Sequence, residues 1–410
     1  MRAALLAGSG VILWVIGWLN DSFAAYMMSG ASVALLAICY GWARASARGF
    51  SCRVLAPSHA TEGQPVSLHW QADNNSRFSR SLLVMLRADN LTTEEPFASE
   101  RVIELAPRLW GQALAEEMTF PARGSYAIPE AEAHATDPLG IFSAARRFDG
   151  PGDILVYPAA ERLPRSDWHG LGDFHTSELR ATPVPTETGE YYGIRSYQWG
   201  DDLRRIHWKA TAHTGTLAVK EFEQWSSPCH IVVVELARSA HRGAGSGSSL
   251  EAAVRAAASI SAHALSVGRS LGLVAIGSQR LVVAPDRGHK QFIHIMEALA
   301  VVKADGDAPL AQQVAAGSVP LPSGSTAVII ASSCAPSLVQ AACSLRSRGI
   351  RVVVILVAAH TFDTSQRPEN GRDEDVFQSM LAGLAGCATV YPLRRGETLA
   401  SAVAGVRLWL

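Results

Sequence analysis

The sequence predicts two N-terminal membrane-spanning helices, an antiparallel β domain and a C-terminal doubly wound α/β domain. Two uncharged apolar runs stand at the N-terminus, and residues 51–157 alternate with the period of two that is typical of strands. After residue 225, short β-branched strands alternate with helical segments. At 410 residues the chain has room for several domains. We divide it into a helical hairpin (1–48), a β-sandwich-like domain (49–158), a connector (159–188), a distinctive segment (189–224) and the α/β domain (225–410).

The overall composition fits a folded chain that is partly embedded in a membrane. Hydrophobic residues make up 48% of the sequence and charged residues 18%, with a formal net charge of −1. This balance gives no indication of a nucleic-acid partner. The six cysteines form no C-x-x-C pair, so the sequence predicts neither a disulfide framework nor a zinc site, and it favours a reducing compartment.

The first forty-odd residues carry the membrane prediction. Residues 3–19 and 23–43 are uncharged, and each run is about as long as the roughly 20 residues needed to cross a hydrocarbon core. Basic residues flank the pair but not the short link between the runs: Arg2 precedes it, and Arg44, Arg48 and Arg53 follow it. The positive-inside rule therefore places both ends, and the soluble domains, in the cytoplasm, as expected of a multi-pass protein of the bacterial inner membrane. A signal peptide is the competing interpretation of the first run, but a second span follows at once without an A-x-A cleavage pattern.

The region from about 51 to 157 predicts a scaffold. Alternation is visible at 66–70 and 82–86, with a turn at 73–76 between them. No strand–helix–strand rhythm occurs, which favours a small antiparallel sandwich. We expect no catalytic cluster in this region.

The region after residue 225 predicts a parallel sheet covered by helices. Strands are expected at 230–236, 271–277, 281–284, 327–331, 352–357 and 389–392, with the third antiparallel; helices are expected at 250–267, 292–302, 337–348, 375–384 and 397–409. Ligands of open α/β sheets bind at the carboxyl ends of the strands. The loop after Leu236 is therefore the place to look for a site.

That loop contains a degenerate version of a metal-binding pattern. Glu235, Ala237 and Ser239 form E-x-A-x-S, which is similar to the D-x-S-x-S of von Willebrand factor A domains, where the oxygens hold magnesium. Alanine supplies no side-chain oxygen, so we expect no cofactor, with Mg²⁺ at Glu235 and Ser239 as the only ion considered. The alternative is that Ser239 caps a turn and Glu235 meets a basic neighbour. The glycines at 243–248 do not match a dinucleotide fingerprint, because they begin too far after the strand and have the wrong spacing.

The segment 189–224 is the densest in charge, aromatic residues and helix-ending signals. It predicts a strand at 191–197, a turn at 199–201, a helix to about 213 and a strand at 217–222. Asp201 or Asp202 is the expected N-cap of the helix, and Gly215 supplies its left-handed stop.

Three interpretations of this segment stay open. It is a surface for a protein partner, formed by Arg195, Tyr197, Gly200, Asp201, Asp202, Arg204, His207, Trp208 and Lys209. Alternatively it is catalytic, with His207 as general base beside Asp201 or Asp202. The third interpretation is structural: Asp202 caps the helix, Arg204 and Arg195 form ion pairs, and Trp208 anchors the β domain to the α/β domain.

The same segment carries a family resemblance. Its run R-S-Y-x-x-G-D-D-x-R-x-I-H-W-K-A resembles the signature of the bacterial family called domain of unknown function 58. The R-G-S-Y at 123–126, the D-P-L-G-I-F at 137–142 and the V-Y-P at 156–158 resemble its upstream pattern. The resemblance implies a von Willebrand factor A-like C-terminal domain and a non-enzymatic adaptor that works with a MoxR-type AAA+ ATPase and its client proteins. A membrane-bound, hydrolase-like enzyme using His207 is the alternative.

Overall fold

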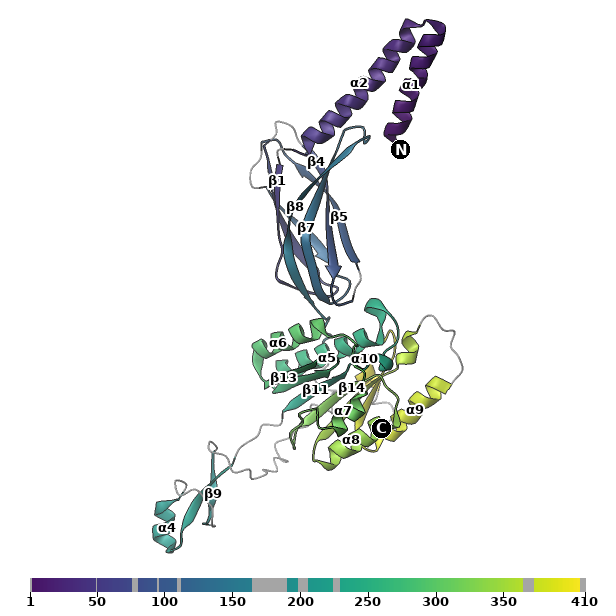
Figure 1. The fold of residues 1–410 in the computed structure, drawn as a ribbon. Helices are drawn as coiled ribbons and strands as arrows, with labels where there is room; N and C mark the ends of the chain where they lie inside the picture. Colours follow the sequence, from purple (N-terminus) through teal and green to yellow (C-terminus); the bar gives the residue numbers. More distant parts are fainter. Residues whose placement is uncertain are drawn as a thin grey trace. The chain divides into compact units, whose positions relative to one another are not determined.

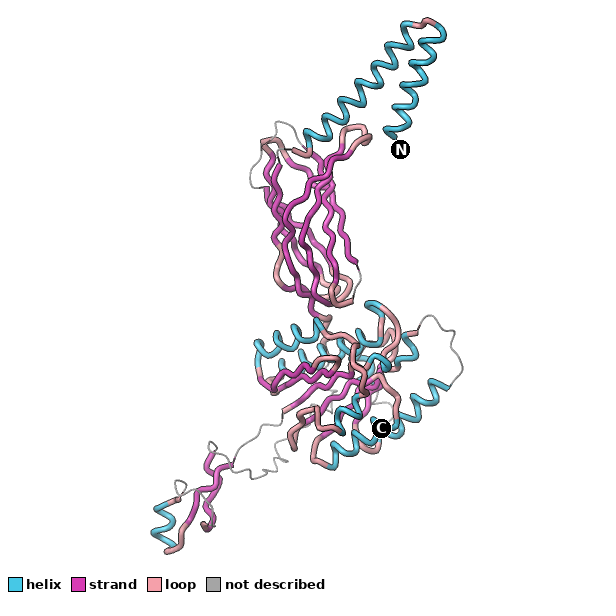
Figure 2. Tube along the Cα trace, viewed as in Figure 1, coloured by secondary structure: helices cyan, strands magenta, loops and turns pink. Residues whose placement is uncertain are grey.

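The computed structural model describes residues 2–48, 50–75, 80–93, 96–108, 112–163, 190–197, 206–223, 229–363 and 372–405 (Figure 1). The chain divides into two compact units. The first comprises residues 1–159 with the short segments 244–251 and 296–303, and the second comprises 160–243, 252–295 and 304–410. Long strands dominate the first unit after its two helices, whereas helices and strands alternate in the second (Figure 2).

Two apolar helices begin the first unit, α1 (Arg2–Asn20) and α2 (Phe23–Ser46). They form a hairpin in which Ser29 of α2 donates a 2.8 Å hydrogen bond from its Oγ to the carbonyl oxygen of Gly10. A Cβ at Gly10 would lie 2.5 Å from the Oγ of Ser32, so a larger residue there would force this hydroxyl to turn away. Both helices are long and apolar enough to cross a membrane, which agrees with the predicted anchor.

Two β-sheets that share one core follow the helices. One has the order β1-β3-β6 and the other β2-β8-β7-β4-β5. Their bounds are β1 Phe50–Leu55, β2 His59–Thr61, β3 Pro65–Asn74, β4 Arg80–Asn90, β5 Pro96–Leu105, β6 Gln112–Thr119, β7 Gly124–Thr136 and β8 Ser143–Tyr157. Neighbouring strands are antiparallel except β2 and β8. Alternate residues of β3 and β4, such as Leu68, Trp70, Leu82 and Leu86, meet in the core, as the period of two predicts.

A fully buried arginine lies immediately before β7. Arg123 is 1% exposed, and its Nη2 lies 3.2 Å from Oε1 of the buried Glu251. The same Nη2 donates a 2.7 Å hydrogen bond to the carbonyl oxygen of Val302. Glu251 and Val302 belong to the short segments 244–251 and 296–303 of the first unit. Buried ion pairs contribute little net stability when intact, but removal of one partner is costly.

The second unit contains a small two-stranded antiparallel sheet and a larger mixed sheet. The small sheet pairs β9 (Glu190–Ser196) with β10 (Ala218–Glu223), and the short helix α4 (Trp208–Thr214) precedes β10. The larger sheet has the order β13-β12-β11-β14-β15-β16. Its bounds are β11 His230–Glu235, β12 Leu271–Ile276, β13 Arg280–Asp286, β14 Thr326–Ala331, β15 Arg351–Val357 and β16 Thr389–Leu393.

Five strands of this mixed sheet are parallel, and β13 is the antiparallel edge predicted from the short link. From β11 the chain continues to β12 on one side, and it later returns to β14 on the other side. Every residue of β11 and β14 is buried. For β11 this agrees with the prediction from its consecutive β-branched residues.

Helices cover both faces of the mixed sheet (Figure 1). On one face, α7 (Leu310–Ala315), α8 (Pro336–Ser347) and α9 (Arg372–Ala385) pack on alternate strand residues such as Val233, Ile329 and Val354. On the other face lie α5 (Ser249–Ser266), α6 (Gly288–Val301) and α10 (Leu399–Gly405). Helix α7 was not predicted, and α10 is shorter than expected within the residues described.

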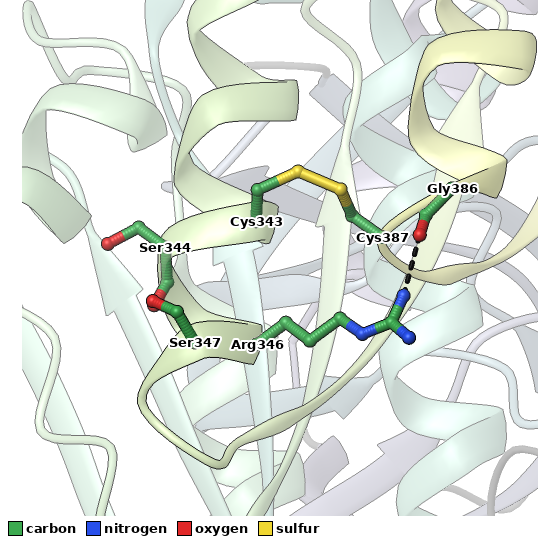
Figure 3. Close-up of a disulfide and its surroundings, with 6 residues drawn as sticks. All are labelled: Cys343, Ser344, Arg346, Ser347, Gly386 and Cys387. Carbon is green, nitrogen blue, oxygen red and sulfur yellow. Dashed lines mark hydrogen bonds between the residues drawn. A yellow bond between two sulfur atoms is a disulfide. The ribbon is translucent and has the colours of Figure 1, made fainter.

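One disulfide corrects the cysteine prediction. Cys343 of α8 is bonded to Cys387, which lies between α9 and β16, with the Cα atoms 5.2 Å apart (Figure 3). The two residues are 44 positions apart, so no short motif reveals them. Beside the disulfide, Arg346 of α8 donates a hydrogen bond to the carbonyl oxygen of Gly386, the residue before Cys387. The sequence predicted no disulfide framework, and that prediction was wrong at this pair. The cysteines therefore do not support the reducing compartment inferred from them.

Candidate functional site

The distinctive segment folds around the pairing of β9 with β10. In this ladder Arg195 is opposite Val219, and Tyr197 continues it by donating a 2.9 Å hydrogen bond from its N–H to the carbonyl oxygen of Leu217. Ile206 makes an isolated bridge to Val219, and the N–H of His207 donates to the carbonyl oxygen of Ala218 at 2.8 Å. The chain immediately before α4 is therefore held against β10.

His207 is the N-cap of α4. Its Nδ1 accepts a 3.0 Å hydrogen bond from the N–H of Ala210, which satisfies one of the free donors at the start of the helix. Gly215 ends the helix with φ 69°, in the left-handed conformation predicted. The prediction of one helix running from Asp201 or Asp202 to His213 was wrong, because Ile206 and His207 are not helical.

The side chains that follow the cap face solvent. Trp208 is 67% exposed and Leu217 is 44% exposed, and Lys209 is also exposed. Tryptophan is a residue type that often supplies binding energy at protein interfaces, because its indole joins a large apolar face to an N–H donor. The structure thus brings Tyr197, His207, Trp208 and Lys209 into one small unit. The predicted residues Gly200, Asp201, Asp202 and Arg204 lie outside the described residues, as does the side chain of Arg195.

Glu235, the first residue of the degenerate metal pattern, forms hydrogen bonds within the protein. Glu235 is 1% exposed, and its Oε2 accepts hydrogen bonds of 2.9 Å from the N–H groups of both Ser332 and Ser333. Its Oε1 accepts a 2.7 Å bond from the hydroxyl of Ser333 and a longer one, 3.4 Å, from the N–H of Leu310. The carboxylate therefore joins the end of β11 to the loop after β14 and to the start of α7. Among the described residues its hydrogen-bond partners are N–H and hydroxyl donors, whereas a basic side chain was expected.

Ser239 is exposed in a short 3-10 turn and takes no part in those hydrogen bonds. Among the described residues, no group of three or more His, Cys, Asp or Glu side chains is arranged to hold a metal ion. At the same edge of the sheet, Asp305 accepts hydrogen bonds from the N–H and the hydroxyl of Ser278. Those bonds lower the pKa of Asp305.

A charged network that the sequence analysis missed lies beyond the carboxyl ends of β15 and β16. Arg394 donates two hydrogen bonds to Glu374, of 2.6 and 3.1 Å, and Nε2 of His360 lies 3.0 Å from the same carboxylate. The hydrogen bonds from Arg394 are the largest cause of a pKa of about 2 at Glu374. The guanidinium also lies over the ring of Phe377, 5.5 Å from its centre.

A cavity of about 200 Å³ lies next to this network. Its charged lining comes from Glu161, Arg255, Arg394 and Glu397. Within the chain, the carboxylate of Glu161 accepts a 2.9 Å hydrogen bond from the N–H of Leu399. No sequence signal could have found this site, because its residues come from distant parts of the chain.

Comparison with known proteins covers part of the chain. Residues 193–369 match the family described as "Protein of unknown function DUF58". The match includes α4 and strands β11 to β15. "Uncharacterized protein YeaD" of Bacillus subtilis is 23% identical over 199 residues, which are 48% of this chain and 47% of that protein. "Uncharacterized protein Rv1480" of Mycobacterium tuberculosis is 32% identical over 132 residues, which are 30% of this chain and 39% of that protein. The chain thus matches less than half the length of these relatives.

Solved structures resemble the chain only weakly. Proximal thread matrix protein 1 from the mussel byssus has a TM-score of 0.29 and 12% identity, over 44% of this chain and 46% of that one. A superoxide reductase (neelaredoxin) from Ignicoccus hospitalis has a TM-score of 0.18 and 13% identity, over 26% of this chain and 80% of that one. Scores this low carry no argument about fold or function.

Proposed function

We propose that this chain is a membrane-anchored, non-enzymatic adaptor that works with a MoxR-type AAA+ ATPase and its client proteins at the cytoplasmic face of the bacterial inner membrane. The observation that carries the proposal is the exposed face of α4, with Trp208 and Lys209 projecting from the segment that resembles the family signature. Trp is among the residue types that supply most of the binding energy at protein interfaces. The apolar hairpin of α1 and α2 would supply the anchor.

The hydrogen bonding of His207 weighs against the hydrolase alternative. A neutral imidazole carries one N–H and one acceptor nitrogen. Because Nδ1 accepts the N–H of Ala210, the proton of the neutral ring is on Nε2, which then donates and cannot act as a base. The cap therefore uses the lone pair that a general base would need.

We infer further that the mixed sheet is a von Willebrand factor A-like domain without its metal. Glu235 occupies the first position of the metal pattern, and its carboxylate is fully engaged by Leu310, Ser332 and Ser333. In this account the loop presents a fixed surface that does not depend on magnesium. Partner binding would then proceed in the presence of a chelator of divalent ions, apart from any requirement of the ATPase for its own nucleotide.

The test is affinity capture of the tagged full-length protein from mild detergent, with and without a non-hydrolysable ATP analogue, read by mass spectrometry. We expect an AAA+ ATPase of the MoxR type to be recovered only with the nucleotide analogue. Recovery of no such ATPase under either condition would contradict the adaptor function.

A further inference from the structure

The turn between β7 and β8, residues 137–142, is held rigid from within; we call it the β7–β8 tip. The carboxylate of Asp137 accepts hydrogen bonds from the N–H groups of Leu139 (3.0 Å), Ile141 (2.8 Å) and Phe142 (2.6 Å). Burial alone would raise the pKa of Asp137, but the N–H donors of Phe142 and Leu139 outweigh that effect and the pKa is lowered. The tip is therefore preformed around a buried, charged carboxylate.

The outer surface of the β7–β8 tip is apolar. Leu139 is 53% exposed, Pro138 and Gly140 are exposed, and Ile141 and Phe142 are half-buried. No charged residue occurs from Pro138 to Ala145. A rigid turn with an exposed leucine at its apex differs from the polar turns that usually close a hairpin in water.

The β7–β8 tip lies against the open end of the helical hairpin, where α1 begins and α2 ends. The ring of Phe142 packs edge-on against that of Tyr40 in α2, with centroids 5.7 Å apart and planes at 81°. Asp137 lies close to Cys39, which precedes Tyr40 in α2. At the start of α1, the Nη1 of Arg2 lies 3.3 Å from where a Cβ of Gly140 would be.

These contacts fix the depth of the β7–β8 tip relative to the helices. Tyr40 precedes the end of α2 at Ser46 by six residues, which corresponds to about 9 Å along the helix axis. Tyrosine and the flanking arginines are typical of the membrane–water interface. On the same end of the hairpin, Leu5 and Ile38 are 67% and 65% exposed, so the apolar surface of the helices continues up to the tip.

We propose that the β7–β8 tip is a third membrane contact, which inserts Leu139 and the edge of Ile141 into the interfacial layer of the bilayer beside α1 and α2. The occupant of this apolar surface is lipid, because the surface continues that of the two helices at the level of their basic and aromatic ends. The inference rests on the membrane anchor of the proposed function. Its consequence is that the β domain is held to the membrane at two places, the helix ends and the tip, so that its orientation to the bilayer is fixed.

The test places a genetically encoded photo-crosslinking residue at position 139 of the full-length chain, reconstituted in vesicles of phosphatidylethanolamine and phosphatidylglycerol with radiolabelled lipid. Position 91 is the matched control: Leu91 is 57% exposed and follows β4 at the far end of the same sheet. In the pairing of β4 with β7, Asn90 lies opposite Tyr126 near the start of β7, whereas Leu82 lies opposite Ala135 near the tip. Positions 91 and 139 are therefore separated by most of the length of β7, roughly 40 Å. Position 33 in α2, where Val33 is 60% exposed, reports the anchor itself.

We expect the probe at 139 to label lipid with a yield close to that at 33 and severalfold above that at 91. Labelling at 33 with none above background at 139 would overturn the membrane contact and leave the anchor intact. Absence of labelling at both 33 and 139 would contradict the membrane anchor of the proposed function and, with it, this inference. Labelling of a second copy of the chain from position 139, in place of lipid, would also overturn the proposal, because protein would then cover the tip.

Discussion

Replacing Glu235 by glutamine should destabilise the C-terminal sheet domain to the same extent with and without magnesium. The carboxylate accepts two N–H donors and one hydroxyl at 2.7 to 2.9 Å while 1% exposed. Glutamine has one acceptor oxygen, and its NH₂ group would face at least one of these donors. A buried donor left without an acceptor costs about 1 to 3 kcal/mol, and bonds to charged groups are at the upper end of the range for hydrogen bonds. We therefore expect a loss of about 2 kcal/mol, or roughly 4 to 8 °C in melting temperature for a domain of this size.

The assay is thermal unfolding of the full-length protein in detergent, with either magnesium or a chelator present. Ser239→Ala is the matched control, because it removes the other oxygen of the degenerate metal pattern from an exposed position and should leave the melting temperature unchanged. The reasoning is refuted if Glu235→Gln melts like the wild type. It is also refuted if magnesium raises the melting temperature of the wild type and the rise is lost in both variants, since that result would mean a working metal site.

Three further predictions concern single side chains. Burial, with Arg269 nearby, lowers the pKa of His230 from 6.5 in the unfolded state to about 4 in the folded state. As the pH falls, the unfolded state therefore binds the proton first, and the free energy of unfolding should fall by up to about 3 kcal/mol between pH 6.5 and pH 4. His230→Leu should flatten this slope in urea unfolding at several pH values, and an unchanged slope would contradict the assignment. His207→Ala should destabilise α4 by about 1 kcal/mol through loss of the N-cap, and His207→Asn should restore that stability. Amide hydrogen exchange at Ala210 measures the effect, and equal exchange in the wild type and both variants would contradict the capping role of His207. The Cys343–Cys387 disulfide closes a 44-residue loop, so the chain-entropy description predicts that its reduction destabilises the sheet domain by about 4 kcal/mol. A variant with serine at both positions should melt at the temperature of the reduced protein, below that of the oxidised protein.

The parts of the fold that repeat a local pattern could be predicted from the sequence. Strands β11 and β14 have apolar runs at 231–234 and 327–331, and the structure buries every residue of both strands. The turn at Gly215 followed from the left-handed conformation that glycine tolerates. The short link after Ile276 required an antiparallel partner, and β13 provides it.

The errors occurred where distant residues decide the local structure. The helix after the signature run was expected to begin at Asp201 or Asp202, but the bridge of Ile206 to Val219 keeps the chain extended, and His207 supplies the cap. The Cys343–Cys387 disulfide depends on how α8 and the loop before β16 approach one another. Likewise, Glu235 has the position of a metal ligand in the sequence, and only the fold shows that two serines and a helix start use its oxygens. Sequence spacing contains none of these contacts.

The central claim is that the exposed face of α4 binds the ATPase partner, and Trp208→Ala tests it most directly. Trp208 is 67% exposed, so the substitution should leave the melting temperature unchanged. Val376→Ala on α9 is the matched control, because it also removes apolar surface from an exposed helix position, at 50% exposure. The measurement is capture of the ATPase by wild-type protein and by both variants in the presence of the non-hydrolysable ATP analogue. The account predicts loss of capture with Trp208→Ala and wild-type capture with Val376→Ala; equal capture by all three proteins would contradict it.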